Sequence, residues 1–250
     1  MQGGQLFIVS LLGGLLPAFI WLWFFLQEDS KRPEPRWLII AAFLSGMLAV
    51  LLALPAEMVG KCIAVGSWPS HPFFNPIDTI AYCKNLPSQI QPVFLWAATE
   101  ELLKYLMAVL FILWRRAVDE PIDAMIYMIT VALGFAAFET GLFLMGPLGN
   151  GDITGGLITG NLRFIGAALL HTISSATIGF FIAIAFYKKV CVQFISLCTG
   201  LVLSIVLHAL FNHHIMTNSK NTTAIVFFCV WLGVIGLLLL FERAKRVSLT

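Results

Sequence analysis

The chain has 250 residues, of which 59% are apolar, counting Cys and Tyr, and only 11% are charged, and its formal net charge is +2. A soluble domain of this length needs far more charge to cover its surface. No basic patch typical of a nucleic-acid-binding protein is present, so we expect no nucleic-acid partner. The composition therefore indicates a protein whose solvent is the lipid bilayer.

Seven apolar stretches are each long enough to cross a hydrocarbon core of about 30 Å, which takes roughly 20 helical residues. They cover residues 6–26, 37–59, 93–114, 122–145, 162–187, 190–214 and 223–241. None shows the alternation of barrel strands, so the sequence predicts an all-α polytopic membrane protein with about seven helices in one membrane domain, 1–250. Glu120, Pro121 and Asp123 predict the start of the fourth helix, because Pro favours the first position and acids favour the positive helix end.

Lys and Arg are distributed unevenly between the two sides of the predicted helices. One side has ten of them in its connections, and the other has three or four. The ten are Lys31, Arg32, Arg36, Arg115, Arg116, Lys188, Lys189, Arg243, Lys245 and Arg246. Because cytoplasmic connections are enriched in Lys and Arg, we expect the N-terminus outside and the C-terminus in the cytoplasm.

The longest connection, residues 60–92, is then expected on the extracytoplasmic side. Cys62 and Cys83 lie toward its two ends. They are either joined by a disulfide, if that side of the membrane is oxidising, or present as two free thiols. Cys191, Cys198 and Cys229 lie within predicted spans and are expected to be buried.

Ionisable residues inside the hydrocarbon cost roughly 2.5–3.5 kcal/mol each, so they need a reason to be there. Here they are concentrated in four consecutive predicted helices, together with one Asn. They are Glu100, Glu101 and Lys104 in 93–114, Glu139 in 122–145, His171 in 162–187, and His208 with Asn212 in 190–214. At 1.5 Å per residue the acids and imidazoles lie roughly 9–14 Å below the outer surface. We therefore expect residues 93–214 to form a four-helix catalytic core around one shared site.

Helical spacing adds supporting partners and also simpler interpretations. Lys104 lies one turn after Glu100, and Ser175 one turn after His171, whereas Glu101 points about 100° away from Glu100. Glu101 and Lys104 could instead form an ion pair that only orients helices, and a lone intramembrane His is as often a packing residue as a catalyst. The concentration of these residues in one layer favours a functional site.

Two chemistries fit such a set of residues. In the first, Glu100 or Glu101 acts as general base on a water, while His208 and Asn212 donate hydrogen bonds to a developing oxyanion. In the second, a divalent metal such as zinc activates the water. Its ligands would be Glu101, Glu139, His171 and His208. The sequence has no HExxH motif, so local spacing does not choose between the two.

The same residues resemble an ordered family pattern. Glu100-Glu101-Leu102-Leu103-Lys104 resembles the EExxK motif of the PrsW family of intramembrane proteases. The Pro-Ile-Asp at 121–123 and the FxxxE at 135–139 resemble its second block, although Thr140 stands where the family often has Asn. His171 and the stretch 208–212 resemble its third and fourth blocks.

This resemblance implies a helical fold akin to the wider Abi group, which includes the CAAX prenyl endopeptidases. It implies an endopeptidase that cleaves a membrane-anchored, single-span protein, with anti-sigma factors as the proposed substrate class, in a bacterial inner membrane. By this analogy Glu100 or Glu101 activates water and Glu139 takes the place of a His in the CAAX enzymes. His208 with Asn212 would make the oxyanion contacts.

Two other functions remain open at this point. The similar spacing from Glu100 to Glu139 and from His171 to His208 hints at a repeated helix hairpin, which is common in proton- or ion-coupled transporters. An inactive scaffold that holds a partner helix is a third interpretation. The sequence specifies neither the substrate, nor the use of a metal, nor the oligomeric state.

Overall fold

The computed structural model describes residues 3–30, 32–65, 83, 92–216 and 220–247. Its helices in chain order are α1 Gly3–Leu26, α2 Arg36–Val65, α4 Val93–Ala108, α5 Pro121–Gly149, α6 Ile153–Leu162, α7 Ala168–Ile184, α8 Val190–Met216 and α9 Lys220–Ala244. Three short segments extend them: a 3₁₀ turn Gln27–Asp29 after α1, and π-helical segments Val109–Leu113 after α4 and Arg163–Ala167 between α6 and α7. All regular structure in these ranges is helical, which confirms the predicted all-α class.

Six helical stretches in the described ranges are long and apolar enough to cross a membrane. They are Gly3–Asp29, Arg36–Ile63, Pro121–Gly149, Ile153–Ile184, Val190–Ile215 and Thr223–Ala244. The remaining predicted span, 93–114, corresponds to α4 with its π-helical extension, and its three buried charges set it apart from the others. This helix nonetheless belongs to the bundle: α2, α5, α7 and α8 pack against it, and Phe94, Leu102 and Leu106 are exposed on its outer face.

The fifth predicted span, 162–187, begins earlier in the structure than the sequence suggested. The helix starts at Ile153 because Asp152 caps it, accepting a hydrogen bond from the backbone N–H of Gly155 at 2.8 Å. The result is one long helical stretch, α6 to α7, with the π-helical segment Arg163–Ala167 near its middle. That segment lies one to two turns before His171.

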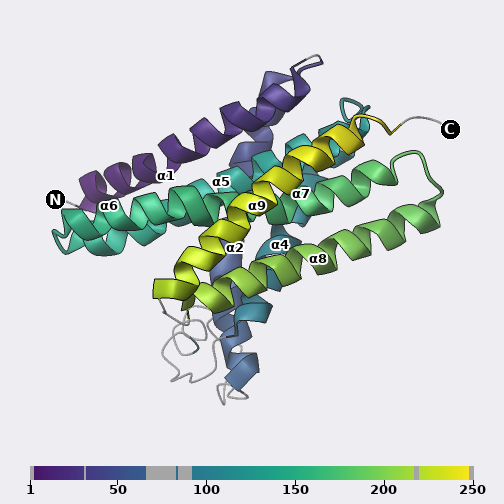
Figure 1. Cartoon of the computed structure of the whole chain (residues 1–250). Helices are drawn as coiled ribbons and strands as arrows, with labels where there is room; N and C mark the ends of the chain where they lie inside the picture. Colours follow the sequence, from purple (N-terminus) through teal and green to yellow (C-terminus); the bar gives the residue numbers. More distant parts are fainter. Residues whose placement is uncertain (1–2, 31, 66–82, 84–91, 217–219, 248–250) are drawn as a thin grey trace, which may run out of the picture.

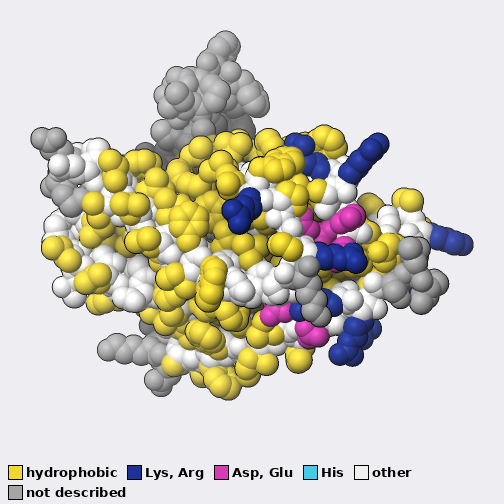
Figure 2. Space-filling view, turned by 90° about the horizontal axis from the view of Figure 1, so that it is seen from above, with side chains coloured by type: hydrophobic (Ala, Val, Ile, Leu, Met, Phe, Trp, Pro, Cys, Tyr) yellow, Lys and Arg dark blue, Asp and Glu magenta, His cyan; other side chains and the backbone are white. Residues whose placement is uncertain are grey.

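The outside of the bundle is apolar and parts of its inside are charged, the reverse of a soluble protein. Large side chains such as Trp23, Trp37 and Leu239 are exposed, whereas Glu101 and Lys104 are fully buried. Figure 2 shows apolar side chains over most of the visible face, with Lys and Arg gathered toward one end. In Figure 1 α9 ends at that end, and α1 begins at the opposite one. On this face the charged side chains therefore collect at one end of the bundle, and the predicted orientation of the termini stays a prediction.

Helix α5 forms the centre of the bundle. Every residue from Pro121 to Ala137 is buried, and α1, α2 and α7 pack around it. Its start matches the prediction, because Asp123 accepts hydrogen bonds from the backbone N–H groups of Asp119 and Glu120 at 2.9 and 2.7 Å. A buried helix of this kind needs its first turn satisfied by its own side chains.

Helices α2 and α5 touch backbone to backbone through two glycines. A Cβ placed on Gly134 would lie 1.9 Å from the carbonyl oxygen of Phe43, and one on Gly46 would lie 1.9 Å from that of Val131. Small residues at helix crossings permit this approach in membranes. The crossing holds α2 beside the part of α5 that precedes Glu139.

Gly134→Ala is therefore expected to lower the melting temperature of the purified protein in detergent. The added methyl group meets backbone, so the helices must separate, at a cost of about 3 kcal/mol, the upper part of the usual range for overpacking. Gly236→Ala is the matched control, because a Cβ there meets nothing within 4 Å. Equal melting temperatures for the two variants would contradict the close crossing.

The cysteines divide into two groups. Cys62 of α2 and Cys83 form a disulfide, which resolves the alternative left open by the sequence. Most of the predicted loop 60–92 lies outside the described residues. The expectation that Cys191, Cys198 and Cys229 are buried is wrong, since all three are free and exposed on α8 and α9. Hydrophobicity could not separate core from lipid-facing positions, because both are apolar in a membrane protein.

Candidate active site

The charged residues of α4 enter the centre of the bundle on different sides of the helix. Glu101 and Lys104 are fully buried, and their side chains form an ion pair at 2.6 Å. Glu100 is 6% exposed and lines a cavity, whereas Glu101 does not line it. This difference follows from the rotation of about 100° between consecutive helical residues. Two adjacent carboxylates thus occupy two different environments.

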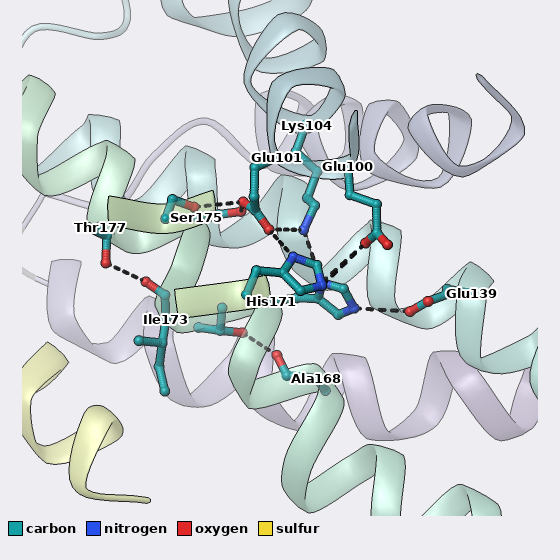
Figure 3. A network of polar contacts seen from close by, with 12 residues as sticks. Glu100, Glu101, Lys104, Glu139, Ala168, His171, Ile173, Ser175 and Thr177 are labelled. Atoms are coloured by element: carbon teal, nitrogen blue, oxygen red, sulfur yellow. Dashed lines mark hydrogen bonds and ion pairs between the residues drawn. The ribbon is translucent and has the colours of Figure 1, made fainter. Parts of the chain in front are cut away.

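Glu101 is held by partners from three helices. Besides Lys104, it accepts hydrogen bonds from Ser175 of α7 at 3.1 Å and Ser204 of α8 at 3.0 Å. Nδ1 of His208 lies 2.7 Å from its other oxygen. Figure 3 shows the contacts of this carboxylate with Ser175 and Lys104. A carboxylate with this many contacts is fixed in place and has little capacity left for a substrate or a water.

His171 of α7 lies between a cation and a carboxylate. Its Nδ1 is 2.9 Å from Nζ of Lys104, and its Nε2 is 3.0 Å from Oε2 of Glu139. An ammonium group only donates hydrogen bonds, so Nδ1 must accept and the ring proton belongs on Nε2, which donates to Glu139. The ring also packs against Phe135, with centroids 5.3 Å apart. The environment therefore fixes both the orientation and the tautomer of this histidine.

Glu100 and His208 form the open part of the network. Nδ1 of His208 donates to Glu101, which leaves Nε2 directed toward Glu100, 3.7 Å from its Oε2. The same oxygen is 3.9 Å from Nδ1 of His171. Within the described part of the chain, Oε2 of Glu100 has no hydrogen-bond partner, although it is buried. A buried oxygen in this state is a candidate for binding a water or an ion.

The cavity next to these groups has a volume of about 660 Å³ and is lined by side chains from α2, α4, α5, α7, α8 and α9. It brings together five of the predicted catalytic residues, Glu100, Glu139, His171, His208 and Asn212. Most of its remaining lining is apolar. The cavity can therefore surround an extended apolar segment and present it to a small polar centre.

Two ionisable residues of this cavity were missed by sequence reasoning. Glu57 of α2 lines it, and so does Arg163, which forms an ion pair with Glu139 and donates to Thr140 at 3.0 Å. Both lie near the ends of predicted spans, where charges usually face the interface. A predicted span that started at Ile153 would have placed Arg163 inside the helix, and would have identified it as a charged residue within the membrane.

The arrangement also fits a divalent metal ion. One carboxylate oxygen of Glu100 and one ring nitrogen each of His171 and His208 lie within 4.8 Å of one another, a mixed nitrogen and oxygen set that zinc accepts. Each ring donates its other N–H to a carboxylate, as metal-binding histidines usually do. Lys104 occupies Nδ1 of His171 in this arrangement, so an ion could bind that nitrogen only once this contact opens.

The predicted metal set was different. It contained Glu101 and Glu139 in place of Glu100. In the structure these two carboxylates lie behind the imidazoles, one bonded to His208 and the other to His171. The sequence placed these residues at a similar depth, but it could not say which carboxylates bond the imidazoles and which one faces the cavity.

A helical membrane bundle that surrounds a cavity with buried carboxylates and imidazoles has the features of a membrane-embedded hydrolase. The sequence model described as "PrsW family intramembrane metalloprotease" matches residues 34–240. The chain therefore belongs to the PrsW family, and it is a membrane-embedded protease. This confirms the family resemblance found in the motifs and favours a protease over a transporter.

Two curated relatives are each named "Protease PrsW". The one from Oceanobacillus iheyensis is 28% identical over 239 residues, which cover 94% of either chain. The one from Geobacillus kaustophilus is 26% identical over 169 residues, which cover 67% of this chain and 63% of that protein. No solved structure matches the chain.

Proposed function

We propose that this protease hydrolyses a peptide bond of a single-span membrane protein, and that Glu100 is the carboxylate at the reacting water. The main support is Oε2 of Glu100, a buried oxygen that has no hydrogen-bond partner among the described residues and faces a cavity beside two imidazoles. Leaving such an oxygen unsatisfied costs about 1–3 kcal/mol or more, so it is expected to be retained for a function.

The other polar residues then divide into two roles. Glu101 and Glu139 are positioning residues, since each accepts a hydrogen bond from one imidazole and also pairs with a cation. Asn212 lies one turn after His208 on α8 and lines the same cavity. We assign Asn212 to the oxyanion that forms during hydrolysis, together with His208 in the version of the mechanism without a metal ion. His208 can donate from Nε2 only as an imidazolium, because its Nδ1–H is bonded to Glu101.

Glu100, His171 and His208 are the residues that would hold a metal ion, with zinc as the ion whose ligand preference they match. Such an ion lowers the pKa of a bound water to about 7. The family description as a metalloprotease supports this version of the proposal. The roles of Glu101 and Glu139 are the same with or without the ion, because both act through the imidazoles.

The substrate and the location follow from the family and from charge. The names of the relatives describe proteases, and the family resemblance points to anti-sigma factors as the substrate class. The bacterial relatives and the Lys and Arg bias support a bacterial plasma membrane with the N-terminus outside. The polar centre then lies in the outer half of the bilayer, so cleavage would occur near the extracytoplasmic end of the substrate helix.

Cleavage of a single-span reporter by the purified protein in detergent micelles tests this function. We expect the wild type to cut the reporter within its transmembrane segment and His208→Ala to lose at least about 100-fold of that rate. His214→Ala on the same helix is the matched control, because His214 is exposed and its ring bonds the backbone of Leu210. Equal cleavage by the wild type and His208→Ala would contradict the site assignment.

The same assay separates the two ways of activating water. We expect exhaustive chelation to stop cleavage and added Zn²⁺ to restore it. Cleavage that survives chelation would assign the step to the carboxylate of Glu100 alone. Solute uptake by proteoliposomes, without cleavage of the reporter, would instead support a transporter.

A further inference from the structure

A second group of acidic residues lies at the end of the bundle where α1 and α9 end. Asp29 closes the 3₁₀ turn after α1, Glu34 lies in the connection to α2, and Asp123 is in the first turn of α5. One carboxylate oxygen of each lies within 4.8 Å of the others. We call these three residues the acidic triad. Figure 2 shows acidic side chains among the Lys and Arg residues of this end.

The members of the acidic triad have few partners for their charge. Asp123 accepts from the backbone at the start of α5, and Glu34 accepts from the hydroxyl of the fully buried Tyr127. Asp29 is only 7% exposed, yet its Oδ2 has no hydrogen-bond partner in the described part of the chain. Asp29 also accepts a hydrogen bond from the backbone of Glu34, and the carboxyls of Glu34 and Asp123 are hydrogen-bonded to each other. None of these partners is a cation, so none supplies a positive charge to the acidic triad. A buried carboxylate oxygen without a partner requires either a proton or a ligand.

The nearby cations are bonded to other acids. Arg32 pairs with Glu120, and Lys245 pairs with Glu28 and Glu242 at 2.8 Å each. Among the described residues, no member of the acidic triad forms an ion pair. Like charges this close disfavour one another's ionised forms.

The pKa of Glu34 reflects this crowding. Burial raises the pKa of Glu34 above its ordinary value, and the carboxyls of Asp123 and Asp29 raise it further, against the lowering effect of the Tyr127 hydrogen bond. A group in this situation is neutralised either by a proton or by a bound cation.

We propose that the acidic triad binds one hard divalent cation of the Mg²⁺ and Ca²⁺ class. Its ligands are all carboxylate oxygens, which these ions prefer, whereas zinc and copper prefer sites with nitrogen or sulfur. Asp29 also lines a cavity of about 600 Å³. In this proposal the ion and its remaining water ligands enter through that cavity. The bound ion ties the connection between α1 and α2 to the start of α5.

This site is separate from the one that contains Glu100. Asp123 and Glu139 both lie on α5, and at 1.5 Å per residue their positions are about 24 Å apart along the helix. Because α5 is buried and carries Glu139, a cation at its first turn fixes the helix that positions the active site. The cation is structural and takes no part in the hydrolysis.

The test uses the full-length protein, stripped of metal and held in detergent. We expect Ca²⁺ or Mg²⁺ to raise the melting temperature of the wild type in a saturable way. Asp29→Asn and Glu34→Gln should each weaken the apparent affinity by at least about tenfold, because each removes a charged ligand. Glu28→Gln is the control, since Glu28 lies next to Asp29 and pairs with Lys245 outside the triad.

Terbium luminescence provides a second measurement that does not depend on unfolding. Tb³⁺ is a probe for such oxygen sites, and Tyr127 beside Glu34 can sensitise it. We expect saturable emission from the wild type and Glu28→Gln, and a lower emission at saturation, without the contribution of the acidic triad, in Asp29→Asn and Glu34→Gln. An ion at the Glu100 site adds the same signal to every variant, because that site is intact in all of them.

Two results would overturn the proposal. One is the absence of a saturable shift in the wild type with either cation. The other is an equal response in the wild type and both triad variants. Either result would mean that protons neutralise the acidic triad, and neither would affect the assignment of the protease site.

Discussion

Glu100→Gln is expected to lower the kcat for reporter cleavage by about 10²–10⁴-fold while the melting temperature stays the same or rises. The activity falls because an amide can neither take a proton from water nor serve as a charged ligand. The stability does not fall because Oε2 of Glu100 has no hydrogen-bond partner to lose among the residues that the structure describes, and because its buried charge is removed. Functional groups often reduce stability in this way.

Glu101→Gln is the informative comparison, because the two carboxylates are adjacent in sequence. Glu101 pairs with Lys104 and bonds His208, so its replacement should lower both the activity and the melting temperature. Circular dichroism melting and reporter kinetics on the same preparations measure both effects. If Glu100→Gln kept wild-type activity, or if Glu101→Gln lost activity with no loss of stability, the assigned roles would be wrong.

Lys104→Met is expected to destabilise the folded protein by about 3–5 kcal/mol, the range for removing one partner of a buried ion pair. Lys104 is fully buried, its Nζ is 2.6 Å from Glu101, and it contacts the rings of His171 and Phe135. Met fills a similar volume, so most of the loss comes from the charge left on Glu101. Thermal or denaturant unfolding in detergent measures the effect.

The double variant Lys104→Met with Glu101→Gln separates charge from packing. Without the lysine, the buried Glu101 carboxylate loses its cation, and neutralising it should recover part of the stability lost in Lys104→Met. A double variant that is destabilised by the sum of the two single effects would show that the pair does not interact. Lys189→Met, at an exposed position directly before α8, is a control for the loss of a lysine charge.

The sequence predicted the all-α class and the place of most helices, because long apolar stretches have few alternatives in a bilayer. It also predicted that Glu100, Glu139, His171 and His208 would lie close together, and the structure places all four on one cavity. That prediction needed only the depth of each residue below the outer surface. The depth follows from the number of residues between it and the outer end of its helix. Whether these residues carry out the proposed chemistry is for the assays above to decide.

Rotation about the helix axes was harder to predict than depth. The spacing showed that Glu100 and Glu101 point in different directions, but the choice of the cavity-facing residue depends on which helices surround α4. Arg163 was not predicted as a site residue, because the predicted span 162–187 begins one residue before it. Residues 153–161 contain several Gly and Thr, which are typical of a connection between helices. Lipid-facing and buried positions are both apolar, so the exposed cysteines could not be recognised either.

The arrangement of the five cysteines makes the native protein suited to spectroscopic labelling. Two are joined in the disulfide, and the other three are free on the surfaces of α8 and α9. Cys191 and Cys198 lie two turns apart on α8, and Cys229 is on α9. Nitroxides attached to these thiols would report helix separations and bilayer depth without an engineered residue. Reducing agents should be left out, since they would open the disulfide and add two more reactive thiols.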